Sequence, residues 1–459
     1  MPLAWAPLEP VVSAAMPESA QSTDLTEALS HLDELTNWER RPRGSMRVGL
    51  GPMYDLMRRL GNPHESFRSV HVAGTKGKGS VCALIEAGLL RAGLRVGRYS
   101  SPHVEHVTER VSLLGQPTAE AKLARALLQT LDEYEAAKQA ETPASDATWF
   151  DILTAAAFLM FKEAKLDWAV VEVGIGGRLD STNVVNAEIA IVTNIELEHT
   201  EILGSSREAI ATEKAGILKP GAALATTLAA DDAAGRALQE RANQLGCPVL
   251  RANFAADATI EERNVDLVGL ALDYLGGRGV NARPDQGVET SVGAWLLDGA
   301  TRIRARLPGR LERREIYGFG DAPDASRAMP VVFDGAHIPF NLAAVIRDLN
   351  RQPDLRGPCV AIVALAGDKD AAGFLLELSR RAAVAVFTES PVAGRGRSAV
   401  DLAELATSLG IASETEPDPR RAFERGVQLA SDAGAWVLVT GSLYLVGALR
   451  AHTTPSHER

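Results

Sequence analysis

The 459-residue chain has few cysteines, no long apolar run and no excess of basic residues, and each absence excludes a class of protein. Its three cysteines, Cys82, Cys247 and Cys359, are far apart and odd in number. This argues against a disulfide framework and favours thiols in a reducing compartment. No apolar run approaches the roughly 18 residues of a membrane span, and the N-terminus lacks a basic stretch before an apolar core. We therefore expect a cytoplasmic protein without a membrane partner.

The net charge of −11 argues against nucleic acid as the main partner, because phosphate backbones favour a basic face. An acidic protein can still bind anionic small molecules where a local site is positive. The hydrophobic fraction of 46% and the charged fraction of 23% are ordinary for a globular protein. The length exceeds what one hydrophobic core usually supports, which predicts at least two domains.

The most informative stretch is residues 69–80, with the sequence SVHVAGTKGKGS. An apolar run that includes Val70 and Val72 leads into a glycine-rich loop, and apolar residues at helical spacing follow. This order predicts a strand, a tight loop and a helix N-terminus, where backbone N–H groups and the helix dipole favour a phosphate. Lys78 would then contact the outer phosphates, and Ser80 would offer its hydroxyl to a divalent metal.

The spacing in this loop is shorter than in the usual P-loop pattern. That pattern has four residues between its first glycine and the Gly-Lys pair, whereas only Thr75 and Lys76 separate Gly74 from Gly77. A cluster of glycine and lysine also fits a solvated turn. The strand before the loop and the helix after it favour a phosphate loop.

Apolar strands alternate with helical segments along the rest of the chain, which predicts an α/β fold with parallel sheets covered on both faces. Between residues 254 and 303 the periods conflict, and we expect short strands and loops there. The alternation then resumes, which indicates a second α/β unit. The expected organisation is a loose extension at 1–24, a P-loop-containing parallel-sheet ATPase domain at 25–309, and a smaller Rossmann-like α/β domain at 310–459.

Several polar residues follow the expected strands. Glu172 ends an apolar strand, and His199 comes a few residues after another. The carboxyl ends of parallel strands meet at one edge of a sheet, where ligands gather. There the Ser80 hydroxyl, the Glu172 carboxylate and the His199 imidazole suit a divalent metal that bridges nucleotide phosphates. A carboxylate at an exposed strand tip and a structural histidine are the alternatives.

Two further motifs are less specific. Glu213 and Lys214 lie on an expected helix, and their pattern alone favours an ordinary surface pair. Asp334 and His337 follow a strand of the second unit in a turn-like Asp-Gly-Ala-His sequence. Together with Arg310 at the boundary, this turn could close over a nucleotide from the opposite side.

Taken together, these motifs resemble folylpolyglutamate synthase/dihydrofolate synthase, a branch of the Mur ligase superfamily. They occur in the family's order across roughly residues 50–450, and the ordered set is highly specific. The segments that carry the resemblance are 60–63, 71–80, 100–103, 109–110, 148–151, 172–183, 193–199, 213–217, 308–310, 334–337, 368–370 and 440–442.

The resemblance implies an ATP-dependent ligase that joins the carboxylate of dihydropteroate or a reduced folate to the amino group of L-glutamate. The carboxylate would first attack the γ-phosphate of ATP, and the acyl phosphate would then react with the amine. Catalysis of this kind depends largely on charge neutralisation and positioning. The resemblance also implies a monomer.

Residue roles follow from the resemblance position by position. Lys78 holds the outer phosphates, and Lys78, His199 and Lys214 are the implied catalytic residues. Lys214 matches a carbamylated lysine, in which a long-armed carboxylate replaces the ammonium group. The resemblance assigns one Mg²⁺ to Ser80, Ser101 and Glu172, and a second to Glu172 and His199, with Lys214 as a further ligand. It assigns ATP to Gly74, Thr75, Lys76, Gly77, Lys78, Gly79, Ser80, Arg310, Asp334 and His337, and the pterin substrate to Thr148, Phe150 and Asp180.

Three residues depart from the family pattern. Lys76 stands where the family often has asparagine, which adds a positive charge beside the phosphates. Glu198 replaces an aspartate before the histidine, and Ile338 replaces an asparagine after Asp-Gly-Ala-His. Two alternative functions stay open at this point. One is a ligase of the same superfamily that acts on a non-folate carboxylate, and the other is a P-loop regulatory module, which would leave Lys214 and the second unit unexplained.

Overall fold

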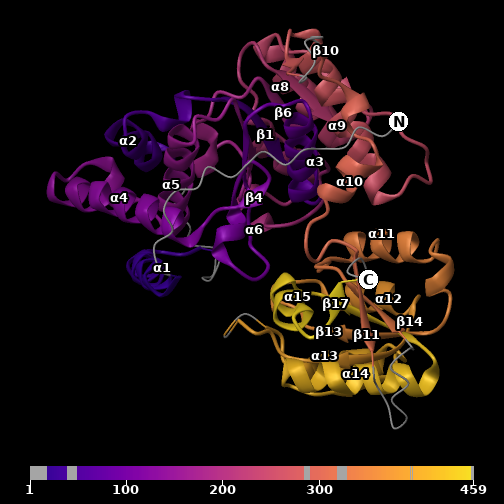
Figure 1. The fold of residues 1–459 in the computed structure, drawn as a ribbon. Helices are drawn as coiled ribbons and strands as arrows, with labels where there is room; N and C mark the ends of the chain where they lie inside the picture. The colour runs from indigo at the N-terminus through magenta and orange to yellow at the C-terminus, as the bar shows by residue number, and fades with distance from the viewer. Residues whose placement is uncertain are drawn as a thin grey trace.

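The computed structural model describes residues 18–38, 49–283, 290–317, 328–392, 394 and 396–455. Its strands form two main sheets that lie in separate parts of the molecule (Figure 1). The first sheet contains only strands from residues 68–251, and the second contains only strands from residues 312–455. This arrangement confirms the predicted α/β class with two successive units.

The first sheet has eight strands in the order β4-β3-β2-β5-β1-β6-β7-β8. Strands β2, β5, β1, β6, β7 and β8 run parallel to one another. Strands β3 and β4 extend the sheet beyond β2 and pair antiparallel. Strand β1 lies in the middle, so its C-terminal end is flanked by the ends of β5 and β6. The strand bounds are β1 Arg68–Ala73, β2 Val96–Tyr99, β3 Val111–Leu113, β4 Gln116–Pro117, β5 Trp168–Glu172, β6 Ile189–Val192, β7 Ala223–Thr226 and β8 Val249–Arg251.

Helices cover both faces of this sheet. Side chains alternate along each strand, so that Val170 packs against one helical layer and Val171 against the other. One layer contains α3 (Lys78–Arg91), α9 (Ile260–Gly277) and α10 (Gly299–Arg304). The other contains α1 (Glu18–Asp33), α2 (Gly51–Arg59), α4 (Glu120–Gln139), α5 (Trp149–Glu163), α7 (Arg207–Ala215) and α8 (Ala233–Leu245).

The second sheet has seven strands in the order β15-β14-β13-β16-β12-β11-β17. Strands β12 to β16 run parallel, and β11 pairs antiparallel with both β12 and β17. The strands are β11 Glu312–Tyr317, β12 Ala328–Phe333, β13 Cys359–Val363, β14 Ala382–Phe387, β15 Ser413–Thr415, β16 Trp436–Thr440 and β17 Thr454–Pro455. The helices are α11 Pro339–Leu349, α12 Ala371–Leu378 and α13 Ala399–Ser408 on one face, and α14 Pro419–Ala433 and α15 Leu443–Arg450 on the other.

Short elements complete the fold. A two-stranded ribbon pairs β9 (Asn281–Ala282) with β10 (Thr290–Ser291), and α6 spans Thr200–Leu203. The 3-10 turns are η2 Pro63–Glu65, η3 Val107–Arg110, η4 Pro143–Asp146, η5 Ser181–Val184, η6 Ala294–Leu296 and η7 Pro353–Leu355.

The structure corrects the sequence-based expectation for residues 254–303. This segment contains the 18-residue helix α9, where short strands and loops were expected. Thr259 and Glu262 form a capping box at its start, with each side chain accepting from the other's backbone N–H. Helix α1 also begins inside the range predicted as an extension, at Glu18, whereas residues 1–17 lie outside the described part of the chain.

Two sequence-based expectations concern the whole chain. All three cysteines are buried and unpaired. Within the described residues, we find no helix that combines the length and the apolar character needed to span a membrane.

Candidate functional site

The glycine-rich loop lies between β1 and α3, as predicted. Gly77 takes the left-handed conformation (φ +82°) at the position that precedes α3. Gly74 has a φ of +149°, and a Cβ atom there would lie 1.9 Å from Thr193 Oγ1. Both positions therefore need glycine, which lets the chain turn tightly from β1 into the start of α3.

The end of β6 fixes this loop in place. The backbone N–H of Thr75 donates to the Asn194 carbonyl (2.9 Å), and that of Lys76 donates to Asn194 Oδ1 (2.8 Å). The Thr193 hydroxyl donates to the Lys76 carbonyl at 2.6 Å. The side chain of Lys78 folds back, with Nζ 3.3 Å from the Gly74 carbonyl oxygen. Asn194 was not among the predicted site residues, because an asparagine after a strand gives no distinctive signal.

Glu172 is a buried carboxylate beside the phosphate loop. It ends β5 and pairs in register with Val72 of β1, and only 4% of the residue is exposed. The backbone N–H of Ser101 donates to its Oε2 at 3.3 Å. Burial raises the pKa of Glu172, and the positive charge of Lys78 opposes that rise. A buried carboxylate with few partners is a typical ligand for a cation.

Among the described residues, no three His, Cys, Asp or Glu side chains lie close enough together to form a metal centre. The donors present are the carboxylate of Glu172, the hydroxyls of Ser80 and Ser101, and the imidazole of His199, which line one cavity. Mg²⁺ commonly uses one or two carboxylates and completes its shell with water and phosphate oxygens. The chemistry of this donor set therefore fits Mg²⁺ bound together with a nucleotide.

Lys214 lies on α7, close to the glycine-rich turn that follows β5. At Gly177 of that turn, a Cβ atom would lie 2.8 Å from the Glu213 carbonyl oxygen, so the turn packs directly on the helix. Only 5% of Lys214 is exposed. Burial, with the nearby charge of Lys78, lowers its pKa to about 7. A substantial fraction of its amino group is therefore neutral near pH 7.

An aromatic pocket lies on the other side of this turn. Asp180 accepts hydrogen bonds from the backbone N–H groups of Ile175 and Thr182, both at 3.0 Å, and from the Thr182 hydroxyl. The Phe150 ring packs against Gly174, where a Cβ atom would lie 2.8 Å from the ring. Burial raises the pKa of Asp180, and the hydrogen bonds from Thr182 and Ile175 oppose this. The pocket therefore offers an aromatic wall and a carboxylate.

Thr148 has a structural role as well as a place in the cavity lining. It is the N-cap of α5, where its hydroxyl donates to the Asp151 carboxylate at 2.7 Å. The side chain is thus already hydrogen-bonded within the protein.

The predicted residues of the second unit line the same cavity as the phosphate loop, and His337 reaches that loop, with Nε2 2.7 Å from Lys76 Nζ. Asp334 accepts from the backbone N–H groups of Leu311 (2.9 Å) and Ala336 (2.8 Å). Burial raises its pKa, whereas the charge of Arg310 lowers it. Arg310 itself reaches back to the Gly309 carbonyl through Nη1, at 3.2 Å. Asp334 thereby holds the start of the linker against the end of β12.

An ionic cluster joins the two units at the phosphate loop. Glu198 Oε1 lies 3.0 Å from Lys76 Nζ, 3.0 Å from His337 Nε2 and 3.3 Å from Lys369 Nζ. Although burial acts to raise the pKa of Glu198, Lys76 and His337 bring it well below its ordinary value. Lys369 belongs to segment 368–370, which carries part of the family resemblance, but the sequence does not mark it as a site residue. Lysines on loops carry little positional information in a sequence.

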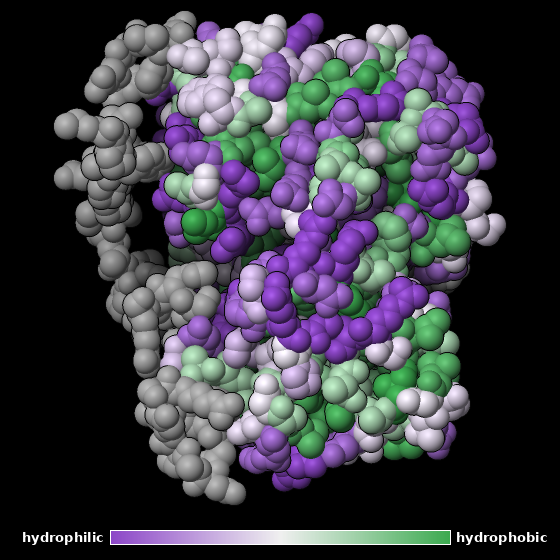
Figure 2. All heavy atoms as spheres, turned by 90° about the vertical axis from the view of Figure 1, so that its right-hand side faces the viewer, coloured by the Kyte–Doolittle hydropathy of each residue, from purple (hydrophilic) through white to green (hydrophobic). Residues whose placement is uncertain are grey.

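These parts surround one cavity of about 1410 Å³ between the two units. The face in Figure 2 shows hydrophilic side chains gathered where the upper and lower parts of the molecule meet. The cavity brings together all of the predicted site residues except Gly74 and Lys214, which lie outside its lining. The described residues that line it reach from the phosphate loop to the pocket of Phe150 and Asp180, and to Arg310, Asp334 and His337 of the second unit.

Comparisons with known proteins agree with this geometry. The Mur ligase middle domain family matches residues 72–269, and the Mur ligase glutamate ligase domain family matches residues 322–443. A dihydrofolate synthase/folylpolyglutamate synthase of Bacillus subtilis is 30% identical over 438 residues, which cover 89% of this chain and 96% of that protein.

Two solved structures show the same architecture. Mycobacterium tuberculosis folylpolyglutamate synthase, complexed with ADP and AMPPCP, superposes with a TM-score of 0.76 at 26% identity, covering 94% of this chain and 98% of that one. A Yersinia pestis bifunctional folylpolyglutamate synthase/dihydrofolate synthase, complexed with AMPPNP and a Mn ion, gives 0.73 at 28% identity, covering 95% and 99%. The chain belongs to the dihydrofolate synthase/folylpolyglutamate synthase family of Mur ligases.

Proposed function

We propose that this protein adds L-glutamate to dihydropteroate and to reduced folates, coupled to the cleavage of ATP to ADP and phosphate. One observation carries the proposal. A single cavity joins a phosphate loop to a pocket with an aromatic wall and a buried carboxylate, formed by Phe150 and Asp180. An ATPase without a second substrate has no need of such a pocket. The names and domain descriptions of the relatives support the same reaction.

The reaction needs an activated carboxylate, because a carboxylate ion does not form an amide with an amine at neutral pH. An oxygen of the substrate carboxylate attacks the γ-phosphorus, and the bond to the β–γ bridging oxygen breaks to release ADP. The glutamate amine then attacks the acyl carbon, phosphate leaves, and the amine proton passes to solvent. Lys78 and the N–H groups of the loop neutralise the phosphate charge that develops during the first step.

Ser80, Ser101 and Glu172 would hold Mg²⁺ against the nucleotide phosphates, and Glu172 and His199 would serve a second ion. Bound Mg²⁺ supplies positive charge that polarises the phosphoryl group. The protein side chains would hold the ion in position. Glu172 is held by the end of β5 and by the Ser101 N–H, and its carboxylate faces the start of α3 at Gly79.

We also propose that Lys214 is carbamylated. The depressed pKa, about 7, leaves a neutral amine that can attack carbon dioxide to give a carbamate and a proton. The modified side chain would carry a negative charge near Lys78. In the unmodified protein, the positive charge of Lys78 destabilises the protonated amine of Lys214. The burial that disfavours an ammonium group is offset for a carbamate by this neighbour.

A purified-protein assay tests the proposed function. ATP, Mg²⁺ and L-glutamate are supplied with dihydropteroate, with tetrahydrofolate, or with neither, and phosphate release is followed together with product mass. We expect release only with a pterin substrate, and a product heavier by one glutamyl residue. Release with an unrelated carboxylate would favour the non-folate ligase, and nucleotide binding without any product would favour a regulatory module.

A further inference from the structure

The second unit contacts the first through α15, the helix that also packs against Gly335 in the turn that follows Asp334. Helix α15 packs against the loop of residues 101–106, which follows β2 in the first unit. The contact is backbone to backbone, because a Cβ atom at Gly447 would lie 2.1 Å from the Val104 carbonyl oxygen. A glycine on the middle of a helix costs stability relative to alanine. The close approach explains why this helix has one.

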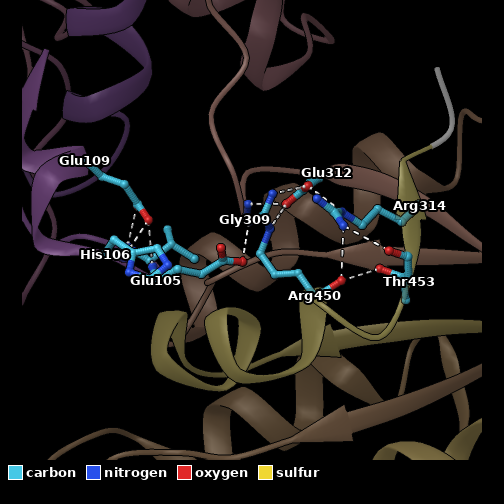
Figure 3. A network of polar contacts seen from close by, with 9 residues as sticks. Glu105, His106, Glu109, Gly309, Glu312, Arg314, Arg450 and Thr453 are labelled. Carbon is cyan, nitrogen blue, oxygen red and sulfur yellow. Dashed lines mark hydrogen bonds and ion pairs between the residues drawn. The ribbon is translucent and has the colours of Figure 1, made fainter. Parts of the chain in front are cut away.

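Arg450, the last residue of α15, strengthens the same contact (Figure 3). Its guanidinium donates to Glu312 through Nε (2.9 Å) and Nη2 (2.8 Å), and through Nη1 to Glu105 of the loop. Only 12% of the Arg450 side chain and 16% of the Glu312 side chain are exposed. Charge-assisted, two-pronged contacts of this kind fix orientation as well as distance.

The linker between the units is part of this network. Glu312, at the start of β11, also accepts from the Gly309 N–H (2.8 Å) and from Arg314 Nε (2.8 Å). Arg314 Nη1 donates to the Arg450 carbonyl at 3.1 Å. Figure 3 shows these groups converging between the loop and the end of α15. A rotation of the second unit about its linker would therefore move the groups that hold Glu105.

The loop is stiff enough to transmit such a movement. The carboxylate of Glu109 accepts from three successive backbone N–H groups, those of Val104 (2.8 Å), Glu105 (2.9 Å) and His106 (2.8 Å). At its other end, the loop begins at Ser101, whose N–H donates to Glu172. A displacement at Val104 or Glu105 is thus connected to the carboxylate beside the phosphate loop through a short, hydrogen-bonded segment.

We propose that α15 positions Ser101 and Glu172 by holding the 101–106 loop, so that the orientation of the second unit controls the affinity of the metal-nucleotide site. Gly447 and Arg450 are positioning residues in this scheme, and neither lies at the phosphate loop. The inference rests on the proposed function only in taking Ser101 and Glu172 as metal-binding groups. If α15 only held the two units together, substitutions at Gly447 or Arg450 would leave both the 101–106 loop and the metal affinity unchanged as long as the units stayed in contact.

Gly447→Ala tests the proposal, because the added methyl group must displace Val104 or α15. The matched control is Gly357→Ala in the same unit, where a Cβ atom would lie 3.7 Å from its nearest neighbour. Two quantities are measured on the full chain. They are backbone hydrogen exchange in a peptide covering residues 101–110, and binding of Mn²⁺ in the presence of AMPPNP, followed by electron paramagnetic resonance.

For Gly447→Ala we expect faster exchange in the 101–110 peptide and Mn²⁺ binding weakened by at least about fivefold, with the control unchanged. Arg450→Lys keeps one positive charge but loses the two-pronged contact, and we expect the same direction of change. Arg450→Lys also tests the proposal if the Gly447→Ala variant fails to fold. Unchanged exchange and unchanged Mn²⁺ affinity in a folded variant would overturn the proposal.

Neither measurement uses a pterin substrate, so the inference and the proposed function can fail separately. A wild-type protein without ligase activity would overturn the proposed function, while weaker Mn²⁺ binding in Gly447→Ala would still support the role of α15. The reverse result would be an active ligase whose Mn²⁺ affinity is unchanged by Gly447→Ala and by Arg450→Lys. It would overturn only the inference about α15.

Discussion

At the scale of single residues, the sharpest prediction concerns Lys214. Its burial and its pKa of about 7 make a bare ammonium group unfavourable there. If a carbamate provides a negative charge at this position, Lys214→Ala should lower the rate of phosphate release by roughly 100-fold, as expected for a lost electrostatic group in an active site. A short carboxylate such as acetate should restore part of that rate by occupying the vacated space.

The control for this prediction is Lys122→Ala, which removes an exposed lysine from α4. It should leave the rate of phosphate release unchanged with and without acetate. Wild-type activity in Lys214→Ala would remove this lysine from the mechanism altogether.

His71 gives a second prediction, based on pH. It lies fully buried in β1, where Nε2 is 2.8 Å from the Thr182 hydroxyl. Burial, with the charge of Lys219, lowers its pKa to about 3, against 6.5 for an ordinary histidine. Between those values the unfolded chain binds more protons than the folded one. The stability contributed by neutral His71 is therefore complete above pH 6.5 and declines as the pH falls, by up to about 1.4 kcal/mol per pH unit.

His71→Gln should be less stable than wild type at pH 7, because the contact with Thr182 is altered. That difference should narrow between pH 7 and pH 5, since only the wild type loses the contribution of a neutral histidine. Urea unfolding at several pH values measures this difference in stability, with His31→Gln, at an exposed position of α1, as the control substitution. A difference that stays constant with pH would contradict the assignment of His71 as a buried neutral group.

Residue types at strand ends could be predicted from the sequence, whereas partners contributed by other parts of the chain could not. Glu172 and His199 each follow an apolar strand, and parallel strands bring their carboxyl ends together. The contacts of Lys76 with Glu198 and His337 depend on how the two units are oriented. The position of Lys214 beneath the glycine turn depends on the packing of α7. Neither arrangement is encoded in local spacing.

At the scale of elements, the phosphate loop gives a third prediction. Gly74→Ala would place a methyl group 1.9 Å from Thr193 Oγ1, in a backbone conformation that alanine rarely adopts. We expect the affinity for a fluorescent ATP analogue to fall at least tenfold, because the loop must move away from Thr193. Gly277→Ala, at the end of α9 with nothing within 4 Å of the new Cβ, should bind the analogue as the wild type does. Equal affinity in Gly74→Ala would show that the loop tolerates a different shape.

Helices and strands with a clear hydrophobic period and clear flanking residues could be predicted from the sequence. Helix α9 is an element for which that prediction was wrong. The apolar side chains of α9 pack against α3 and strand residues on one side, and against short turns on the other. The residues Gly269, Gly276 and Gly277 weaken its helical signal. Gly276 is needed because a Cβ atom there would lie 2.0 Å from the Val292 carbonyl oxygen. The capping box at Thr259 and Glu262 and the helical spacing of Val268, Leu272 and Leu275 are local signals that could have identified the helix.

At the scale of the whole molecule, alternation of strands and helices was enough to predict two α/β units, but not how they meet. Three contacts join them around the cavity: the ionic cluster at Glu198, the packing of α15 on the 101–106 loop, and the contact of α9 with α11, where the Ile260 N–H donates to the Asp348 carboxylate. All three combine residues that are more than 80 positions apart in the sequence. Because side-chain geometry rather than hydrophobic periodicity determines these contacts, a structure is needed to find them.

The ionic cluster leads to the last prediction. Glu198→Gln removes the carboxylate that Lys76 and Lys369 share, and among the described contacts it leaves Lys369 paired with Asp368. Removing one partner of a buried ion pair costs about 3 kcal/mol, and here that cost falls on a contact between the two units. We therefore expect the units to separate in the free protein, and the radius of gyration from small-angle X-ray scattering to increase. ATP should reverse the increase, because its phosphates would supply the missing negative charge. Glu201→Gln on α6, an exposed neighbour, should scatter as the wild type does. An unchanged radius in Glu198→Gln would show that the other contacts, of α15 with the 101–106 loop and of α9 with α11, are sufficient to hold the units together.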